Sequence, residues 1–358
     1  MGKELVVVAI SGGVDSTVAA YLLKQKGYDV VGLTMCFNLD NSLEKNKFCC
    51  SGKVVEDAKR VCDELGIKHY VINLKEELKK WVIKDFLNEY QLGRTPNPCV
   101  RCNQYIKFGI LLKKAISLGA RYLATGHYAK IEKIKDTNFY ILKKAKDKLK
   151  DQSYFLYRLG QKKLRHILFP LGAYTKKQVR KIAKELGLEV ADKLASQEIC
   201  FLMNSDYRQF LKNYTHHQIK PGLILDTQAN ILGKHQGIAF YTIGQREGLG
   251  IARGYPLYIN KIDPKNNRII VGKKEEVFKK EFLIKKPHFI LKPLKKKIEV
   301  KVRIRYNHKE APAEVIPSEG KIKVIFKKPQ FAITPGQSAV FYDKDIVLGG
   351  GIIDKVLD

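Results

Sequence analysis

The chain has 358 residues, with 66 Lys or Arg against 36 Asp or Glu, so its formal net charge is +30. Hydrophobic residues make up 45% of the sequence, which excludes a disordered chain. No apolar stretch approaches the roughly 20 residues that cross a bilayer, and no basic leader precedes the first one. We therefore expect a cytoplasmic protein without a membrane partner. The positive charge favours binding to a phosphate backbone, and a lysine-rich, heat-adapted surface is the alternative.

The first 200 residues alternate apolar strands with amphipathic helices. We predict strands at residues 4–10, 29–35, 69–74 and 122–126, and helices at residues 15–26, 54–65, 76–90, 105–118 and 176–186. This alternation predicts an α/β fold with a doubly wound, mostly parallel sheet that has helices on both faces. Ligands of such a sheet are expected beyond the carboxyl ends of its strands.

The pattern changes after about residue 205. A short helix at residues 207–213 precedes a Gly-rich, polar stretch, and a pair of strands is expected at residues 257–262 and 268–271. Strict alternation at residues 298–306, 322–326 and 339–342 predicts a small C-terminal β-barrel or sandwich, of which we favour the barrel. Three domains are therefore expected: a catalytic domain at residues 1–205, a small central domain at 206–278 and the barrel at 279–358.

A basic run begins the expected barrel. Residues 279–303 contain ten Lys or Arg and two Glu. Such a run is usually a solvated face, but at this place in a basic chain it also fits a face that binds RNA.

The segment SGGVDS at residues 11–16 follows the first strand and opens a helix. Its adjacent glycines let backbone N–H groups close around an anion, its serines add hydroxyl donors, and the helix N-terminus adds partial positive charge. The alternative is an ordinary turn capped by Asp15. The combination of strand, loop and helix favours a phosphate-binding loop. Residues 9–16 resemble the pyrophosphate loop of the N-type ATP pyrophosphatases, and this resemblance implies ATP binding with Asp15 beside Mg²⁺.

Seven cysteines are too few for a disulfide scaffold in a chain of this length. In the segment TPNPCVRCN at residues 95–103, a helix that begins near Arg101 would place Cys102 at its N-terminus and lower the pKa of that thiol. Cys36 and Cys62 are expected in the core. A zinc site that joins Cys49 and Cys50 to the CxxC pair is a weaker alternative.

Together with ATGHY at residues 124–128, KDQSY at 150–154, YTIGQ at 241–245 and TPGQ at 334–337, these segments resemble the tRNA-specific 2-thiouridylase family over the whole chain. The resemblance implies ATP-dependent transfer of sulfur to C2 of the wobble uridine in the tRNAs for Lys, Glu and Gln. It implies tRNA and a persulfide donor, either a cysteine desulfurase or a sulfur-relay protein, as partners.

The resemblance also implies roles for individual residues. Cys102 would be the nucleophile, and Cys200 would carry the persulfide. The residues implied in ATP binding are Ala9, Ile10, Ser11, Gly12, Gly13, Val14, Asp15, Ser16, Met35 and Gly126. Those implied in contacts with the target base are Asn97, Pro98 and Cys99, and those implied in contacts with the rest of the tRNA are His127, Lys150, Asp151, Gln152, Arg305, Tyr306 and Gln337. Some family members carry Asp at the position of Cys99.

The chemistry agrees with these residue types. The C2 oxygen of uracil leaves poorly and must be adenylated before sulfur can replace it, and a persulfide with a second thiol can supply that sulfur. One alternative is an iron–sulfur cluster held by Cys99, Cys102 and Cys200. The others are a different adenylating enzyme of the same superfamily and an RNA-binding protein with an inert loop.

Overall fold

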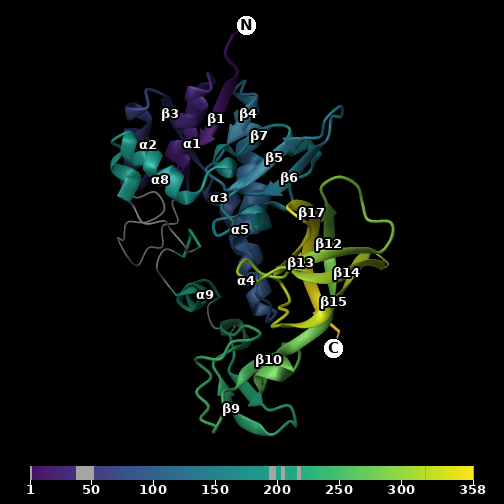
Figure 1. Cartoon of the computed structure of the whole chain (residues 1–358). Helices are drawn as coiled ribbons and strands as arrows, with labels where there is room; N and C mark the ends of the chain where they lie inside the picture. Colours follow the sequence, from purple (N-terminus) through teal and green to yellow (C-terminus); the bar gives the residue numbers. More distant parts are fainter. Residues whose placement is uncertain are drawn as a thin grey trace. The chain divides into compact units, whose positions relative to one another are not determined.

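The computed structural model describes residues 2–37, 52–192, 199–202, 206–215, 219–318 and 320–357 (Figure 1). The chain divides into two compact units. Unit 1 comprises Met1–Val82, Cys99–Met203 and Asp345–Leu348, and unit 2 comprises Ile83–Pro98, Asn204–Lys344 and Gly349–Asp358.

Unit 1 contains a five-stranded parallel sheet with the strand order β3-β2-β1-β4-β7. Its strands are Leu5–Ala9 (β1), Asp29–Cys36 (β2), Lys68–Asn73 (β3), Tyr122–Ala124 (β4) and Ile167–Leu168 (β7). The chain winds from β1 to one edge of the sheet and then returns to continue on the other side of β1. The strand order therefore reverses between β1 and β4, and folds of this kind bind their ligands at the carboxyl ends of the strands there.

Helices cover both faces of this sheet, as predicted. Val6 and Val8 of β1 belong to one apolar cluster with side chains of α1, α2 and α8. Val7, which points to the opposite face, is 1% exposed. The helices of unit 1 are Val14–Gln25 (α1), Gly52–Glu64 (α2), Lys75–Leu78 (α3), Pro98–Arg101 (α5), Leu112–Ser117 (α6), Gln161–Leu164 (α7) and Lys176–Glu185 (α8), with π-helical segments Lys79–Ile83 (η1) and Cys102–Leu111 (η2) and 3₁₀ turns Ser153–Leu156, Pro170–Ala173 and Glu189–Asp192.

Unit 1 also contains an antiparallel pair of strands that the sequence analysis did not predict. Strands Ala129–Lys133 (β5) and Tyr140–Lys144 (β6) pair with each other. Ile346 and Val347, at the start of strand Ile346–Val356 (β17), pair with β6.

Unit 2 contains a small mixed sheet with the order β10-β11-β8-β9. Its strands are Gly222–Leu225 (β8), Ile231–His235 (β9), Tyr258–Asp263 (β10) and Arg268–Gly272 (β11). The helices Lys84–Gln91 (α4) and Tyr207–Thr215 (α9) contact each other through Phe86 and Phe210, whose ring centroids are 6.0 Å apart. The 3₁₀ turns of this unit are Ile238–Phe240 and Lys274–Val277.

A six-stranded closed barrel follows, as the sequence predicts. Its strand order is β12-β15-β14-β13-β16-β17, and pairing of β12 with β17 closes it. Phe282, Phe326 and Phe341 are fully buried in it. The strands are Phe278–Phe289 (β12), Ile298–Arg303 (β13), Ala311–Ser318 (β14), Lys321–Phe331 (β15), Ser338–Asp343 (β16) and β17.

Two of the predicted helices have different bounds. The helix predicted at residues 105–118 begins at Pro98, because proline is well suited to the first turn of a helix, where its missing N–H costs nothing. The helix predicted at residues 76–90 is interrupted by the π-helical segment η1. Within the described residues, no helix has the length and apolar character needed to cross a membrane.

Candidate active site

The segment at residues 11–16 forms the connection between β1 and α1. Gly13 is the N-cap residue of α1, with an extended backbone, so Asp15 is not the cap but lies in the first turn. The Ser16 hydroxyl donates to the carbonyl of Gly13 at 3.0 Å and accepts the backbone N–H of Ser11 at 3.2 Å. The loop is therefore closed on itself beside the N-terminus of a helix, and this arrangement suits a bound phosphate.

Glycine is required at two positions around this loop. Gly12 has a φ of +66°, and a Cβ there would lie 2.9 Å from Cβ of Asp57. A Cβ at Gly126, which follows β4, would lie 2.8 Å from the carbonyl carbon of Asp15 and 2.9 Å from the backbone nitrogen of Ser16. The end of β4 thus lies against the loop, at the point where the strand order reverses. The structure brings Gly126 to the loop, and half-buried Met35 lies near the carboxyl end of β2.

The carboxylate of Asp15 has two partners that the sequence analysis missed. Lys176 donates to Oδ1 and to Oδ2 of Asp15, at 2.7 Å each, and the Tyr128 hydroxyl donates to Oδ1 at 2.7 Å. Burial and the nearby Asp15 carboxylate raise the pKa of Tyr128, so this phenol stays protonated. Lys176 lies 161 residues from Asp15 in the sequence, and no local pattern marks it.

The two cysteines of the CxxC pair lie on one helix, which runs from α5 into η2. Cys102 is 8% exposed and Cys99 is half-buried. Cys200 lies on the short described segment at residues 199–202 and is exposed. Cys200 acts on the pKa of both Cys99 and Cys102, so the structure brings it close to the CxxC pair across 98 residues of sequence.

The predicted activation of Cys102 is wrong for this state of the chain. The helix begins at Pro98, so Cys102 lies within it and is buried. Burial raises the pKa of Cys102 to about 12 and that of Cys99 to about 11, while the ammonium group of Lys107 lowers both. Protein atoms around the sulfur also raise the pKa of Cys200 by displacing water, although the residue as a whole is exposed, and Lys107 again lowers it. The three groups are therefore thiols near neutral pH, and Lys107 is the cation that favours their thiolates.

His127 follows β4 and is 8% exposed. Its Nδ1 lies 2.7 Å from the Thr125 hydroxyl, and its ring lies against Phe108 and Phe169. Burial, together with Lys107, holds its pKa well below the ordinary value, so the ring is neutral. An ionic contact of His127 with tRNA is therefore not available in this state.

The side chains of residues 151 and 152 form hydrogen bonds within unit 1. The Asp151 carboxylate is 3% exposed and accepts the backbone N–H of Ala145 at 3.0 Å and the Ser153 hydroxyl at 2.8 Å. The Gln152 side chain accepts the backbone N–H of Tyr128 at 2.9 Å. Lys150 is half-buried in the same turn. Gln152 thereby holds the segment that carries Tyr128, and Asp151 holds the turn in which it lies.

In unit 2, three of the motifs that carry the family resemblance meet at Thr95. The Gln337 side-chain amide donates to the carbonyls of Thr95 and Pro96 at 3.1 and 3.0 Å, and the Thr95 hydroxyl donates to that of Thr242 at 3.1 Å. A Cβ at Gly336 would lie 2.7 Å from the Thr95 carbonyl oxygen. The segment that leads to half-buried Asn97 and buried Pro98 is thus fixed by the YTIGQ and TPGQ motifs.

Arg305 and Tyr306 do not lie on a strand, because β13 ends at Arg303. The Arg305 guanidinium donates through Nη1 to the carbonyls of Phe331 and Ala332 at 2.9 and 3.2 Å. This nitrogen therefore holds the turn against the end of β15. The Arg303 guanidinium lies 5.3 Å from the centre of the Tyr306 ring.

Of the remaining cysteines, Cys62 is a core residue with 0% exposure, as predicted. Cys36 is only partly buried and is disulfide-bonded, so its prediction as a simple core thiol is wrong. Cys49 and Cys50, of the zinc alternative, lie outside the described residues. In the part of the chain that the structure describes, no group of three or more His, Cys, Asp or Glu side chains is arranged to hold a metal ion.

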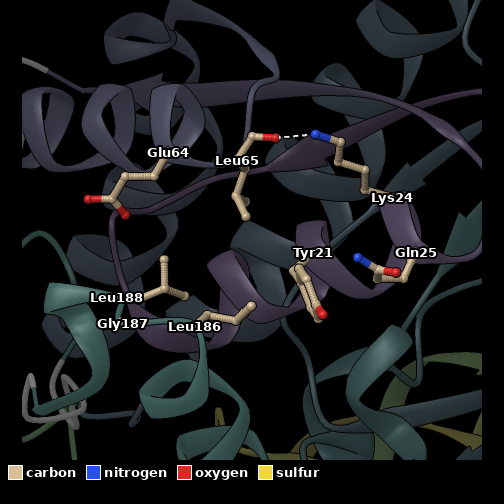
Figure 2. A pocket seen from close by; sticks show the side chains of 8 residues that line it. All are labelled: Tyr21, Lys24, Gln25, Glu64, Leu65, Leu186, Gly187 and Leu188. Carbon is tan, nitrogen blue, oxygen red and sulfur yellow. Dashed lines mark hydrogen bonds between the residues drawn. The ribbon is translucent and has the colours of Figure 1, made fainter.

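A pocket of about 490 Å³ lies at the far end of α1, away from the loop (Figure 2). It is lined by Tyr21, Lys24 and Gln25 of α1, by the end of α2, and by residues 186–188 after α8. Lys24 donates to the carbonyl of Leu65, which also lines the pocket, at 2.6 Å (Figure 2). Since α1 is about 18 Å long, this pocket is separate from the phosphate loop.

The sheet, its reversal point and the closed loop define a nucleotide-binding domain, and comparison with known families agrees. Models described as "tRNA methyl transferase HUP domain", "tRNA methyl transferase PRC-barrel domain" and "Aminomethyltransferase beta-barrel domain" match residues 4–204, 208–273 and 279–353. A tRNA-specific 2-thiouridylase of Clostridioides difficile is 50% identical, with 100% of this chain and 99% of that protein covered. Another, from Caldanaerobacter subterraneus, is 52% identical, and 98% of each chain is covered.

The chain belongs to the tRNA-specific 2-thiouridylase family. The resemblance found in the sequence is thereby confirmed over the whole chain. A likeness among solved structures is much weaker: a 4-thiouridine synthetase in complex with RNA and ATP is 19% identical, with a TM-score of 0.37 and coverage of 59% of this chain and 50% of that one.

Proposed function

We infer that the chain is an ATP-dependent tRNA-uridine 2-sulfurtransferase that acts on the wobble uridine of the tRNAs for Lys, Glu and Gln. The observation that carries this inference is that one unit holds both a closed phosphate loop at the reversal point of its sheet and three cysteines close together. An RNA-binding protein with an inert loop needs neither feature. Full-length relatives that carry this name support the substrate.

In the first step, ATP activates the base. O2 of uridine attacks the α-phosphorus, the bond between that phosphorus and the oxygen bridging to the β-phosphate breaks, and pyrophosphate leaves with its electron pair. The N3 proton is released, so the adenylated base is neutral. Residues 9–16 bind the phosphates, and Met35 and Gly126 lie along the nucleotide. Mg²⁺ commonly binds through one or two carboxylates together with substrate phosphates. Asp15 is the carboxylate of the loop, but both of its oxygens accept from Lys176 in this structure, so Mg²⁺ would have to share this carboxylate with the ammonium group.

In the second step, sulfur replaces the activated oxygen. The terminal sulfur of a Cys200 persulfide attacks C2, and AMP leaves with the electrons of the C2–O bond. The Cys102 thiolate then attacks Sγ of Cys200, and the electrons of the broken S–S bond remain on the sulfur attached to C2. The products are the 2-thio base and a disulfide between Cys102 and Cys200. A dithiol reductant restores the thiols, and a persulfide-carrying donor protein reloads Cys200.

Because the pKa values of the thiols are raised, this scheme requires a step that ionises Cys102. Cys102 must ionise before it attacks, and Lys107 is the group that favours its thiolate. Binding of tRNA beside Asn97, Pro98 and Cys99 would change the surroundings of this helix. The reaction is therefore expected to depend on tRNA for more than its substrate base.

The three predicted domains remain part of this proposal. Residues 1–205 would carry both chemical steps, residues 206–278 would form a small central domain, and residues 279–358 would contact tRNA. The contacts would include Lys150 and the half-buried turn of Arg305 and Tyr306, while Asp151, Gln152 and Gln337 would act through the segments that they hold.

Measurement of the two steps separately tests the proposal. Cys102→Ser and Cys200→Ser should retain tRNA-dependent pyrophosphate release and lose 2-thiouridine formation, whereas Cys62→Ala, a matched control in the core, should retain both. Cys99→Asp should stay active, because relatives carry Asp there. If pyrophosphate release stops in the two serine variants, the division of roles is wrong.

The iron–sulfur alternative gives different results. All three thiolates would then hold iron, so Cys99→Ser would be as damaging as Cys102→Ser, and activity would follow the iron content of protein purified without oxygen. Thiolation by iron-free protein supports the persulfide. A different adenylating enzyme of the superfamily would release pyrophosphate without tRNA.

A further inference from the structure

Lys176 stands beside the phosphate loop without being part of it. It is the first residue of α8, its side chain is 13% exposed, and its ammonium group donates to both carboxylate oxygens of Asp15 at 2.7 Å. Ion pairs on the surface contribute little to stability, and the Lys176 side chain is largely buried against the first turn of α1, so we expect a further role for it.

The sequence around α8 fixes this position. Thr175 caps the helix, with its side chain accepting the N–H of Gln178 and the Gln178 side chain accepting the N–H of Thr175. The backbone N–H of Lys176 donates to Oδ2 of Asp147 at 2.9 Å. Val179 and Ala183, both fully buried, belong to the same apolar cluster as α1. The start of α8 is therefore held firmly against the loop.

The contacts at the two ends of α1 and α8 show that these helices run in the same direction. Lys176, at the start of α8, touches Asp15, near the start of α1, while residues at the ends of both helices line the pocket of Figure 2. The N-termini of both helices, each with partial positive charge, thus meet at the loop.

The loop itself supplies no cationic side chain. The segment SGGVDS has no Lys or Arg, and its only charged residue is the acidic Asp15. Phosphate loops of the other common type carry a lysine within the loop, which reaches the β- and γ-phosphates. Here an ammonium group arrives from 161 residues away instead. An ammonium has three N–H donors, and Asp15 accepts two of them, so Lys176 can bind a phosphate oxygen without leaving Asp15.

We propose that Lys176 is the cation that binds the pyrophosphate portion of ATP and stabilises it as the leaving group, with Tyr128 and Asp15 as its positioning residues. This inference rests on the proposed function, because it assumes that the loop binds ATP. When the bond to the α-phosphorus breaks, its electron pair moves onto pyrophosphate, and the ammonium stabilises that added negative charge without giving up a proton.

The alternative is that Lys176 only stabilises the fold through its ion pair with Asp15. Binding of inorganic pyrophosphate, measured by calorimetry, separates the two. Lys176→Met should bind pyrophosphate at least about tenfold more weakly and release it from ATP more slowly, with tRNA affinity unchanged. Lys176→Arg should recover part of the pyrophosphate affinity and part of the release rate. Lys177→Met, which changes the exposed neighbour on the same helix, should match the unsubstituted chain in both quantities. Equal pyrophosphate affinity in Lys176→Met, with only a lower unfolding temperature, overturns the proposal.

A second measurement needs no variant and covers the case in which Lys176→Met does not fold. Amine acylation of the unsubstituted chain, mapped by mass spectrometry, should show that pyrophosphate protects Lys176 and leaves Lys177 reactive. Equal protection of both, or of neither, contradicts the assignment. If the unsubstituted chain binds neither ATP nor pyrophosphate, the proposed function itself fails. If it binds them, but Lys176→Met does not weaken the binding and pyrophosphate does not protect Lys176, only this inference fails.

Discussion

The side-chain amide of Gln337 donates to the carbonyl oxygen of Thr95 at 3.1 Å. The two residues are 242 positions apart, and each belongs to a motif of the family resemblance. In the same place Gly336 allows the backbone of Thr95 to approach closely. Gln337 therefore fixes the segment that leads to Asn97 and Pro98, and this role differs from a direct contact with tRNA.

The first prediction separates these two roles. Gln337→Ala leaves the carbonyls of Thr95 and Pro96 without their partner, so we expect a loss of about 1–3 kcal/mol in the free energy of unfolding, together with slower thiolation. Denaturant unfolding measures the first effect. Gln228→Ala, on an exposed turn, is the control and should change neither. Weaker tRNA binding at unchanged stability would instead show a direct contact.

The second prediction concerns the close approach of β4 to the loop. In Gly126→Ala the added methyl group would meet backbone atoms of Asp15 and Ser16 at 2.8–2.9 Å, and these cannot move without the loop. We expect ATP affinity to fall by at least about tenfold, with a cost of about 1–3 kcal/mol in stability. Gly254→Ala, whose Cβ would meet nothing within 4 Å, should leave ATP binding intact. Normal ATP affinity in Gly126→Ala would show that the loop can adjust.

The third prediction uses the pKa of Cys102. Because burial raises this pKa from about 9.0 to about 12 in the folded chain, the protonated thiol stabilises the fold below pH 9, and that contribution is lost as the pH rises from 9 to 12. Relative to Cys102→Ala, the unsubstituted chain should lose about 1.4 kcal/mol of unfolding free energy per pH unit in this window. Parallel stability curves for the two chains would mean that Cys102 is not desolvated.

The fourth prediction concerns Lys107. Its ammonium lowers the pKa of the three cysteines, so Lys107→Met should raise those pKa values further and slow the alkylation of Cys102 by iodoacetamide at pH 8. Lys114→Met, on an exposed face of α6, is the control. Faster alkylation in Lys107→Met would indicate that the lysine shields the thiol rather than acting through its charge.

The fifth prediction tests the basic run at residues 279–303. Lys292, Lys295 and Lys296 are exposed between β12 and β13. If they contact tRNA, replacing all three with Gln should weaken binding and reduce the salt dependence by a slope of roughly 0.7–0.9 for each lost phosphate contact. The control replaces Lys26, Lys68 and Lys114, which are equally exposed in unit 1. An unchanged slope would identify the run as a solvated face.

The parts of the site that were predictable from sequence are local ones. Strand, loop and helix at residues 4–26 follow one another directly, so the phosphate loop could be recognised from its own residues. The start of the helix that carries Cys102 could also have been found, because Asn97 and Pro98 are typical of the N-cap and first position. Placing that start near Arg101 led to the wrong direction for the pKa of Cys102.

Contacts between distant segments could not be predicted in this way. Nothing near Lys176 indicates that it reaches Asp15, and nothing near Asp151 or Gln337 distinguishes a side chain that holds the backbone from one that meets tRNA. Strands β5 and β6 were missed for a related reason: both are short and Lys-rich, and the further pairing partners of β6, Ile346 and Val347, lie about 200 residues further along. Tertiary pairing decides such strands more than their own composition.

The most direct test of the central claim is mass spectrometry of nucleosides from tRNA incubated with the purified chain, ATP and a persulfide donor. The account predicts that the wobble uridine gains the mass of one sulfur in exchange for one oxygen, that the gain requires ATP, and that it is lost in Asp15→Ala and in Cys200→Ser. A gain equal to a methyl group, as the description of the matching family model would suggest, or a thiolated base formed without ATP, would contradict it.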